Sequence, residues 1–576
     1  MKKNRYILGI HDGHNCGASL CINGKIISSV LEERITRKKN EVGYPKKSIE
    51  ACLKIANVDS SDLDKVVIAS NFMHHPSYLT DVSSWYLVGK NEQKLDKKIS
   101  KDYLKSVFVQ RKEARIKNVT KHLDIEPINI SFIEHHLAHL AAAYYTSPQL
   151  KKDKKFLGIT CDGAGDGLSA TISICNNNDF HRISSTDRHA SLGKIYSRIT
   201  MLLGMKPWEH EYKIMGLAPY ADQKAAYNES KKIHNLLKLN KNKLKFELNS
   251  HLSTAYSYFY FQEQFERIRF DNIAGAVQLF TEDMLVNWVK AAIKKTKIAD
   301  IVCGGGVFMN VKANMLIQNL PEVNSMYVMP SASDESLSIG AALHYYNNNF
   351  NKNFLTNNGG MSDLYLAEPV SEQDLKATLN KIKKNTNYQI KVNYDFNNII
   401  SDILHNGEAI AVCNGRTEWG ARALCNRSII AKSGSKEIVE KINSQIKMRD
   451  FWMPFAPTIL DTKYKACIED KKNIKPKFMT FALPAQKKAQ GKLAGAMHPV
   501  DKTCRPQVLK KSTNQKIYNM LQTYCKKYKE YGVLQTSFNI HGEPIVNSAS
   551  DAFSTLQRSG LRHLILENFL ISKKKV

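Results

Sequence analysis

The chain has 576 residues, of which 43% are hydrophobic, and its 83 Lys and Arg exceed its 54 Asp and Glu by 29 charges. A chain of this length is too long to fold around a single hydrophobic core, so we expect two domains. No apolar run approaches the roughly 20 residues of a membrane span, the N-terminus lacks a secretory signal, and the eleven cysteines form no CxxC pair. These features exclude a membrane protein and a disulfide framework, and they predict a soluble, cytoplasmic protein with reduced thiols.

The positive charge favours anionic partners such as nucleotides and phosphates. Its lysines are spread along polar helices, and no arginine-rich arm or aromatic-basic RNA motif accompanies them. Nucleic acid is therefore not an expected partner, whereas a homodimer is left open.

Two stretches far apart in the chain predict the same local structure. Residues 5–30 alternate as strand, glycine turn, strand, an "NG" hairpin turn at Asn23-Gly24, and a third strand. Residues 155–185 repeat the pattern, with an acidic glycine turn, "CDGAGDG", after the first strand. Such a recurrence indicates two similar subdomains, as in the actin and sugar-kinase ATPase fold, although chance similarity of two β-meanders is the alternative.

The segment "IEHHLAHLAAAYY", residues 133–145, predicts a helix that carries three histidines. His135 and His139 are four residues apart, so their imidazoles project from one face about 5–6 Å apart at Cβ, close enough to share one ion. His136 points elsewhere, and because it stands where a zinc protease needs Glu, a zincin is excluded. The alternative is a pair of solvated surface histidines.

The segment "IADIVCGGGVFMN" predicts a buried strand, a triple-glycine turn and a helix capped near Asn310. Backbone amides of Gly304, Gly305 and Gly306 could approach a phosphate or ribose closely. No GK[ST] follows, so this is not a Walker loop, and a turn without ligand is the alternative.

Residues 346–361 are rich in Asn and Gly, which places a domain boundary there. We therefore predict a first domain at 1–350 and a second at 361–576.

Read together, segments from both domains resemble the O-carbamoyltransferase family of nodulation and antibiotic-tailoring enzymes. The matching segments of the first domain are "GIHDGHN", "LEERITRKKN", "HHLAH", "CDGAGDG", "HEYKIMGLAPYA", "GGGVFMN" and "PSASDESLSIGAAL". Those of the second domain are "GRTEWGARALCNRS", "RDFWMPFAP", "RPQVL" and "SFNIHGEPIV". The resemblance implies an α/β protein with a duplicated, actin-like, threonylcarbamoyl-transferase-like domain followed by an α/β YrdC-like domain.

In that family the YrdC-like domain converts carbamoyl phosphate and ATP to carbamoyl adenylate, and the first domain transfers the carbamoyl group to an acceptor hydroxyl. By the resemblance, His135, His139 and Asp334 match the metal-binding positions, with helix capping as the alternative for Asp334. Two imidazoles and a carboxylate with open positions suit Fe(II) or a similar ion acting as a Lewis acid. Mg²⁺ is expected only as the companion of ATP.

The resemblance also assigns roles around the first-domain turns. His14 matches the histidine that would act as general base toward the hydroxyl, and His11 is its rival. Asp162, in the equivalent turn of the repeat with Asp166 nearby, would orient acceptor or nucleotide, unless these residues only form the turn. Glu211 and Lys213 of "HEYKIMGLA" match the ribose and phosphate contacts of the family. Glu211 is therefore a candidate nucleotide-binding residue, and Lys213 is a candidate catalytic residue.

Cationic and amide side chains gather in the second domain, where they would bind carbamoyl phosphate and ATP through charge-assisted hydrogen bonds. For each, an ion-pair or turn role is the alternative. The candidates are Arg416, Arg422, Asn426, Arg427, Ser428, Lys447, Arg449, Arg505, Ser537 and Asn539.

Three positions depart from the family pattern: Ala421 and Cys425 replace the usual Pro and Gly, and Asn40 replaces a usual His. We therefore predict an ATP-dependent O-carbamoyltransferase that acts on a hydroxylated small molecule, such as a natural product, sugar or glycan precursor. The variable stretch 71–117 is expected to select the acceptor. The rival functions are a tRNA threonylcarbamoylation enzyme and a non-catalytic nucleotide-binding protein.

Overall fold

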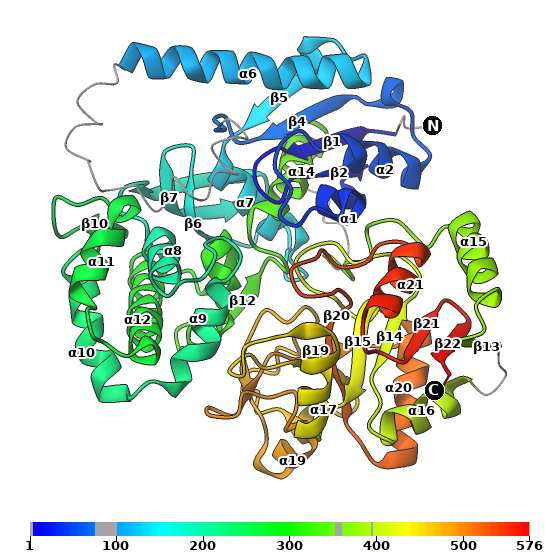
Figure 1. Cartoon of the computed structure of the whole chain (residues 1–576). Helices are drawn as coiled ribbons and strands as arrows, with labels where there is room; N and C mark the ends of the chain where they lie inside the picture. Colours follow the sequence, from blue (N-terminus) through cyan, green and yellow to red (C-terminus); the bar gives the residue numbers. More distant parts are fainter. Residues whose placement is uncertain (1–3, 75–100, 352–359, 393–395, 575–576) are drawn as a thin grey trace. The chain divides into compact units, whose positions relative to one another are not determined.

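The structure, a computed structural model, describes residues 4–74, 101–351, 360–392 and 396–574 (Figure 1). Much of the variable stretch 71–117 that is expected to select the acceptor therefore lies outside the described residues. The chain divides into two compact units, Met1–Glu32 with Asn40–Met361, and Glu33–Lys39 with Ser362–Val576.

The first unit contains two five-stranded sheets of the same topology (Figure 1). In each, three consecutive antiparallel strands are followed by two strands that run parallel to the first. The first sheet has the order β3(Lys25–Leu31)-β2(Gly17–Ile22)-β1(Tyr6–His11)-β4(Lys65–Ala69)-β5(Ile130–Ile133). The second has the order β8(Asp179–Asp187)-β7(Leu168–Asn176)-β6(Phe156–Gly165)-β11(Asp300–Gly304)-β12(Ser325–Val328). The predicted duplicated α/β fold is confirmed.

The predicted hairpin turn is also present. Ile22 pairs with Lys25, and Asn23 and Gly24 between them have φ of 50° and 82°. Positive φ at both turn residues defines the type I′ turn that an "NG" pair favours.

Two helices join the sheets of the first unit. Helix α14 (Leu337–Phe350) packs on β1, β2 and β4, whereas α7 (His135–Thr146) packs on β6 and β11 and against α14. Every residue of α7 except Leu137 is buried, which rules out the surface location considered for its histidines.

The remaining elements of the first unit are α2(Lys46–Ala56), α6(Lys101–Leu123), α8(Leu192–Leu202), α9(Glu211–Leu217), α10(Gln223–His234), the hairpin β9(Leu237–Asn240)-β10(Lys245–Leu248), α11(Tyr258–Gln264), α12(Phe270–Thr296) and α13(Val311–Gln318). Helix α1(Glu32–Thr36) has only its first residue in this unit. Asn310 caps α13 as predicted, because its side chain accepts a hydrogen bond from the Ala313 N–H.

The second unit is built on an eight-stranded mixed sheet. Its order is β13(Tyr388–Val392)-β22(Phe569–Lys573)-β21(His563–Leu566)-β14(Ile410–Cys413)-β15(Arg427–Lys432)-β20(Gly532–Ser537)-β16(Ala456–Leu460)-β19(Gln507–Leu509). Ala411 and Cys413 face one core and Ile410 and Val412 the other, so β14 is apolar throughout because both its faces are covered.

Helices cover both faces of this sheet. One core contains residues of α15(Glu372–Lys383), α17(Lys436–Ile442) and α21(Ala549–Arg558), and the other contains residues of α16(Phe396–His405) and α20(Gln515–Tyr528). Smaller elements are α18(Tyr464–Cys467), α19(Gln490–Leu493) and the pair β17(Leu483–Pro484)-β18(Thr503–Cys504).

An N-terminal segment, Glu33–Lys39, belongs to the second unit, which linear domain boundaries do not anticipate. Arg34 donates to the Gly420 carbonyl, and Arg37 donates to the carbonyls of Pro544 and Ile545. These charged donors to backbone carbonyls fix the segment in place.

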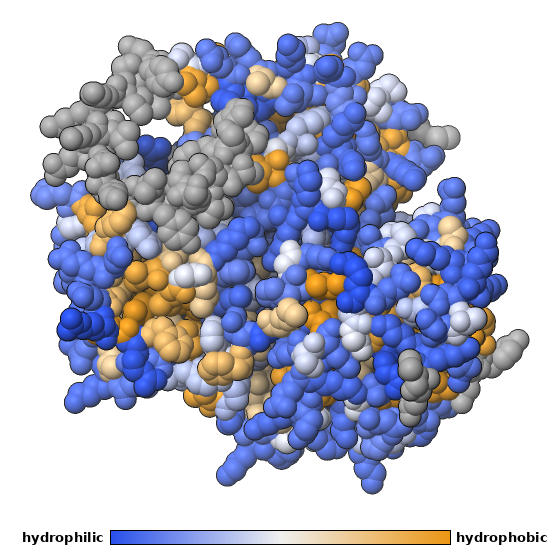
Figure 2. Space-filling view, in the orientation of Figure 1, coloured by the Kyte–Doolittle hydropathy of each residue, from blue (hydrophilic) through white to orange (hydrophobic). Residues whose placement is uncertain are grey.

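All eleven cysteines are free, and all of them are buried. Hydrophilic residues predominate on the face drawn in Figure 2. Among the helices that the structure describes, none has the length and apolar character needed to span a bilayer.

Candidate functional site

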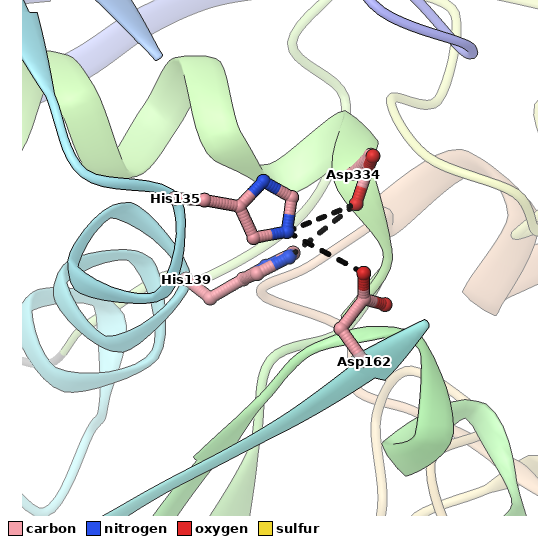
Figure 3. Close-up of side chains that lie close together, drawn as sticks. All are labelled: His135, His139, Asp162 and Asp334. Atoms are coloured by element: carbon pink, nitrogen blue, oxygen red, sulfur yellow. Dashed lines mark ion pairs between the residues drawn. The ribbon is translucent and has the colours of Figure 1, made fainter. Parts of the chain in front are cut away.

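Four buried side chains of the first unit converge on one point: His135, His139, Asp162 and Asp334 (Figure 3). Each offers one ligand atom, and these atoms all lie within 4.8 Å of one another. The histidines come from the first turns of α7, Asp162 from β6, and Asp334 from the short helix Asp334–Ser336 before α14. The structure thus brings together the three predicted metal ligands and adds a fourth, Asp162.

The histidine rings are oriented by their other nitrogens. Nδ1 of His135 lies 3.0 Å from Ser70 Oγ, and Nδ1 of His139 lies 3.1 Å from Ser336 Oγ. Among the described residues, the buried Nε2 atoms of both rings have no hydrogen-bond partner. An Nδ1–H bonded to a hydroxyl leaves the Nε2 lone pair directed at the cluster, as in metal sites, so these residues fit a metal ion.

The carboxylates complete the set. Asp334 Oδ1, also buried without a hydrogen-bond partner among the described residues, lies 3.4 Å from His139 Nε2 and 3.7 Å from His135 Nε2. Asp162 Oδ2 lies 3.4 Å from His135 Nε2. These separations are too long for strong hydrogen bonds and leave room for an ion between the atoms.

The triple-glycine turn positions Asp162. The Gly306 N–H donates to Asp162 Oδ1 at 2.7 Å, which leaves Oδ2 for the cluster. Gly305 has φ of 95°, and a Cβ there would lie 2.3 Å from the Cys161 carbonyl oxygen. The glycine is therefore needed for the turn to approach β6 so closely. The sequence pattern predicts that this turn contacts a phosphate or ribose, but it does not predict the hydrogen bond from Gly306 to Asp162.

The cluster attracts positive charge. Burial opposes protonation of His135, but Asp334 and Asp162 outweigh it and raise its pKa to about 9. Burial likewise opposes ionisation of Asp334, yet the neighbouring histidines hold its pKa well below the usual range. A group of charges so arranged takes up either protons or a metal cation.

His136 is outside the cluster, as predicted. Its Nδ1 lies 2.9 Å from Thr160 Oγ1, and burial lowers its pKa to about 3. This histidine is therefore a neutral core residue.

His14 and His11 both approach Asp334, with distances to Oδ2 of 3.4 Å and 3.8 Å. His11 is fully buried, which lowers its pKa to about 4, and its Nε2 lies 3.0 Å from the His14 carbonyl oxygen. Because a carbonyl only accepts, that Nε2 carries the proton of neutral His11. His14 is partly exposed, so the structure favours it over His11 for contact with a substrate.

Trp208, which sequence reasoning missed, stacks on the His14 ring at 4.8 Å between centroids. The partly buried Glu211 side chain accepts a hydrogen bond from the Trp208 backbone N–H at 2.7 Å and so supports this turn. Burial raises the pKa of Glu211. Lys213 lies in the same helix, α9, so the predicted nucleotide-binding segment lies close to His14.

Two other candidates of the first unit support the backbone. Asp166 accepts N–H donors of Asn71, Phe72 and His135, so its carboxylate is a structural anchor for the start of α7. The Asn310 amide exchanges two hydrogen bonds with Gln278 besides capping α13, and these bonds favour its structural role.

In the second unit, Lys447 lies at the end of a π-helical turn, Asn443–Lys447. Its buried Nζ donates to Ser537 Oγ and to both oxygens of Asn539, at 2.7–3.2 Å. Burial, with the charges of Arg449 and Lys39, lowers the pKa of Lys447. Arg449 donates to Thr536 Oγ1 at 2.8 Å. Four predicted residues thus gather at the end of β20.

The other predicted group lies beside them, since Ser428 of β15 pairs with Ser537 of β20. Arg427 is fully buried and donates to four backbone carbonyls, while Asn426 and Arg416 also donate to backbone carbonyls. These contacts favour a role in shaping the loop rather than in direct ligand binding.

Glu418, which sequence reasoning missed, organises that loop. Its buried Oε1 accepts the N–H groups of Leu424, Asn426 and Arg427, at 2.7–3.1 Å. Arg422 and Arg505 lie partly buried in loops of the same unit.

Comparison with known families identifies the chain. Residues 6–343 match the carbamoyltransferase N-terminus, and residues 401–573 match the carbamoyltransferase C-terminus. The chain belongs to the carbamoyltransferase family and is an enzyme of that family.

The relatives span several organisms. An uncharacterized protein of Methanocaldococcus jannaschii is 31% identical, covering 99% of this chain and 100% of its own length. Nodulation protein NolNO of Sinorhizobium fredii is 26% identical over 98% of this chain and 79% of its own. The 3′-hydroxymethylcephem-O-carbamoyltransferase of Amycolatopsis lactamdurans is 24% identical over 50% and 52%. Full-length HypF, at 16% identity over 60% of this chain and 56% of its own, has a TM-score of only 0.30 and supports no inference.

Proposed function

We propose that this enzyme is an ATP-dependent O-carbamoyltransferase that acts on a hydroxyl of a small molecule. The observation that carries the proposal is the four-residue cluster, whose orphaned Nε2 and carboxylate oxygen atoms lie beside the partly exposed His14. Two similar proteins, a nodulation protein and a cephem O-carbamoyltransferase, are in keeping with this activity.

In the proposed reaction, the second unit forms the activated donor. Water first cleaves carbamoyl phosphate to carbamate and phosphate. A carbamate oxygen then attacks the α-phosphorus of ATP, and the bond to the leaving pyrophosphate breaks, which gives carbamoyl adenylate. Lys447 and Arg449, whose charges affect each other, would stabilise the negative charge on these phosphates. Glu418 accepts backbone N–H groups of the neighbouring loop, and Arg427 donates to backbone carbonyls beside it. Arg422, Asn426 and Ser428 in and beside this loop are the further residues proposed for the phosphate site.

In the first unit, His14 would accept the proton of the acceptor hydroxyl while the hydroxyl oxygen attacks the carbamoyl carbon. The bond from that carbon to the adenylate oxygen breaks, and AMP leaves. Trp208 would hold the His14 ring in place through the stacking contact. Glu211, Lys213 and the glycine turn 304–306 are the proposed contacts to the nucleotide.

His135, His139, Asp162 and Asp334 would hold a divalent metal ion, for which imidazole and carboxylate ligands favour Fe(II) or a similar transition metal. When bound, the ion supplies Lewis-acid polarisation of the carbamoyl carbonyl. Mg²⁺ would accompany ATP in the second unit.

The test is direct. The purified protein is incubated with ATP, carbamoyl phosphate and hydroxylated metabolites, and products are examined by mass spectrometry for the gain of one carbamoyl group. The His139→Ala variant serves as the control that should form no such product. If unmodified tRNA gains a threonine-dependent carbamoyl adduct and no small molecule does, the proposal is wrong.

A further inference from the structure

We propose that Lys194 binds an anionic group, a carboxylate or a phosphate, on the acceptor molecule. The inference rests on the proposed function and narrows its acceptor to hydroxylated acids. Lys194 lies outside every segment that carried the family resemblance, and the mechanism above does not use it.

Lys194 is held beside the metal cluster by the start of α8. Ser191 caps this helix by accepting the Lys194 N–H at 3.0 Å, and its hydroxyl donates to the Gly163 carbonyl at 2.7 Å. A Cβ at Gly163 would lie 3.9 Å from Lys194 Nζ. The ammonium group therefore lies next to the residue that follows Asp162.

Lys194 also shares a partner with the proposed base. Its Nζ lies 5.3 Å from the centroid of the Trp208 ring, and the same ring stacks on His14. A cation at this distance is attracted by the aromatic face. An acid group bound by Lys194 would thus place the rest of the acceptor beside His14.

Among the described residues, Nζ of Lys194 has neither a hydrogen-bond acceptor nor an ion-pair partner, although the side chain is partly buried. Burial, the largest cause, and Arg198 lower its pKa to about 8. Three carboxylates counteract this shift, Asp162 and Asp334 of the cluster and Glu211 of α9. None of them forms an ion pair with Nζ, so a ligand anion would meet a partly desolvated ammonium group that is still available for a direct contact.

More positive charge lies nearby. Arg111 and Arg188, together with Lys194, lower the pKa of His74, for which burial is the larger cause, to about 4. Arg111 donates to the His74 carbonyl. This concentration of cations disfavours a cationic acceptor and favours an acid.

The test is protection of Lys194 from acetylation in the full-length protein. After limited treatment with acetic anhydride, trypsin releases the acetylated residue within peptide 189–198, because Arg188 and Arg198 flank it. The probes are glucose, glucuronate and glucose 6-phosphate, which share a hydroxylated ring. The exposed Lys290 serves as the internal reference.

We expect at least one acid to lower acetylation of Lys194 several-fold relative to Lys290, while glucose leaves it unchanged. Protection by glucuronate alone would identify the anionic group that Lys194 binds as a carboxylate, and protection by glucose 6-phosphate alone would identify it as a phosphate. If neither acid protects Lys194, or if glucose protects it equally, the proposal is overturned. This readout needs no carbamoyl transfer, so it separates failure of the subsite from failure of the proposed function.

A kinetic comparison provides a second measurement on whichever acid is carbamoylated. Lys194→Met should lower kcat/KM by about tenfold or more, the loss expected from one charge-assisted contact, through a higher KM. Lys194→Arg, which keeps the positive charge, should have a kcat/KM between those of Lys194→Met and the wild type. Pyrophosphate release should be unchanged in both variants. Equal kcat/KM in Lys194→Met and the wild type would contradict the proposal.

Discussion

His139 Nε2 and Asp334 Oδ1 lie 3.4 Å apart, and among the described residues neither atom has a hydrogen-bond partner. Two buried polar atoms left in this state would destabilise the fold unless something compensates them. A metal ion held by these residues would provide that compensation and would connect α7 to the start of α14.

Replacing His139 with alanine should lower the bound metal and abolish carbamoyl transfer while the protein still folds. The variant removes one of the four proposed ligands, and the remaining three would hold the ion less tightly. Metal content by elemental analysis and circular dichroism measure the two effects. His136→Gln is the matched control, because His136 lies on the same helix turn but bonds to Thr160. Wild-type protein that contains no stoichiometric metal and resists chelators would contradict the assignment.

Gly305→Ala should reduce metal affinity and stability together. A Cβ at this position meets the Cys161 carbonyl at 2.3 Å, so the turn must move and weaken the hydrogen bond from Gly306 to Asp162. Gly204→Ala is the control, because Gly204 also has positive φ, of 72°, but open space around its Cβ. We expect Gly204→Ala to cost about 1 kcal/mol and to leave metal affinity unchanged. Equal metal loss in both variants would mean that close approach at the glycine turn is not what positions Asp162.

Acid should destabilise the first unit through His136. Burial holds its pKa at about 3 in the folded chain against 6.5 ordinarily, so the unfolded chain binds the extra proton between these values. Stability is therefore retained above about pH 6.5 and lost as the pH falls, by up to about 1.4 kcal/mol per pH unit for one group. When the free energy of unfolding is measured with denaturant at several pH values, it should depend less on pH in His136→Gln than in the wild type. An unchanged dependence on pH would mean that His136 is not buried as a neutral residue.

His14→Gln should slow transfer by about 10²–10⁴-fold, the usual contribution of a general base, and leave pyrophosphate release intact. Trp208→Leu should slow transfer less, because it removes only the stacking partner of the ring. His11→Gln tests the alternative general base, His11, whose Nε2–H donates to the His14 carbonyl. Single-turnover transfer assays measure all three. A larger loss in His11→Gln than in His14→Gln would reverse the assignment.

Much of the fold was predictable because it depends on local patterns. The "NG" turn, the repeated strand triplets and the Asn310 cap each follow from short-range backbone preferences. The histidine pair was predictable because helical spacing alone places His135 and His139 on one face.

The parts that escaped prediction depend on contacts between distant segments. Asp162 joins the cluster because the Gly306 N–H binds its Oδ1, which leaves Oδ2 beside His135. Trp208 reaches His14 from another part of the chain, with no spacing rule to reveal it. In the second unit, Arg427 is buried and donates its hydrogen bonds to backbone carbonyls. A charged side chain is not expected to be buried from its residue type alone.

Activation and transfer are proposed to take place in different units, and the variants Lys447→Ala and His139→Ala test this division together. Losing one charge-assisted contact to phosphate commonly costs about 2–4 kcal/mol, or roughly 10²–10³ in rate. Lys441→Ala, which removes a surface pair with Glu408, is the control for Lys447→Ala.

The decisive measurement compares carbamoyl-phosphate-dependent pyrophosphate release with transfer from preformed carbamoyl adenylate in both variants. We predict that Lys447→Ala loses pyrophosphate release and keeps transfer, whereas His139→Ala keeps pyrophosphate release and loses transfer. If both variants fail identically in both half-reactions, the separation of activation from transfer is contradicted.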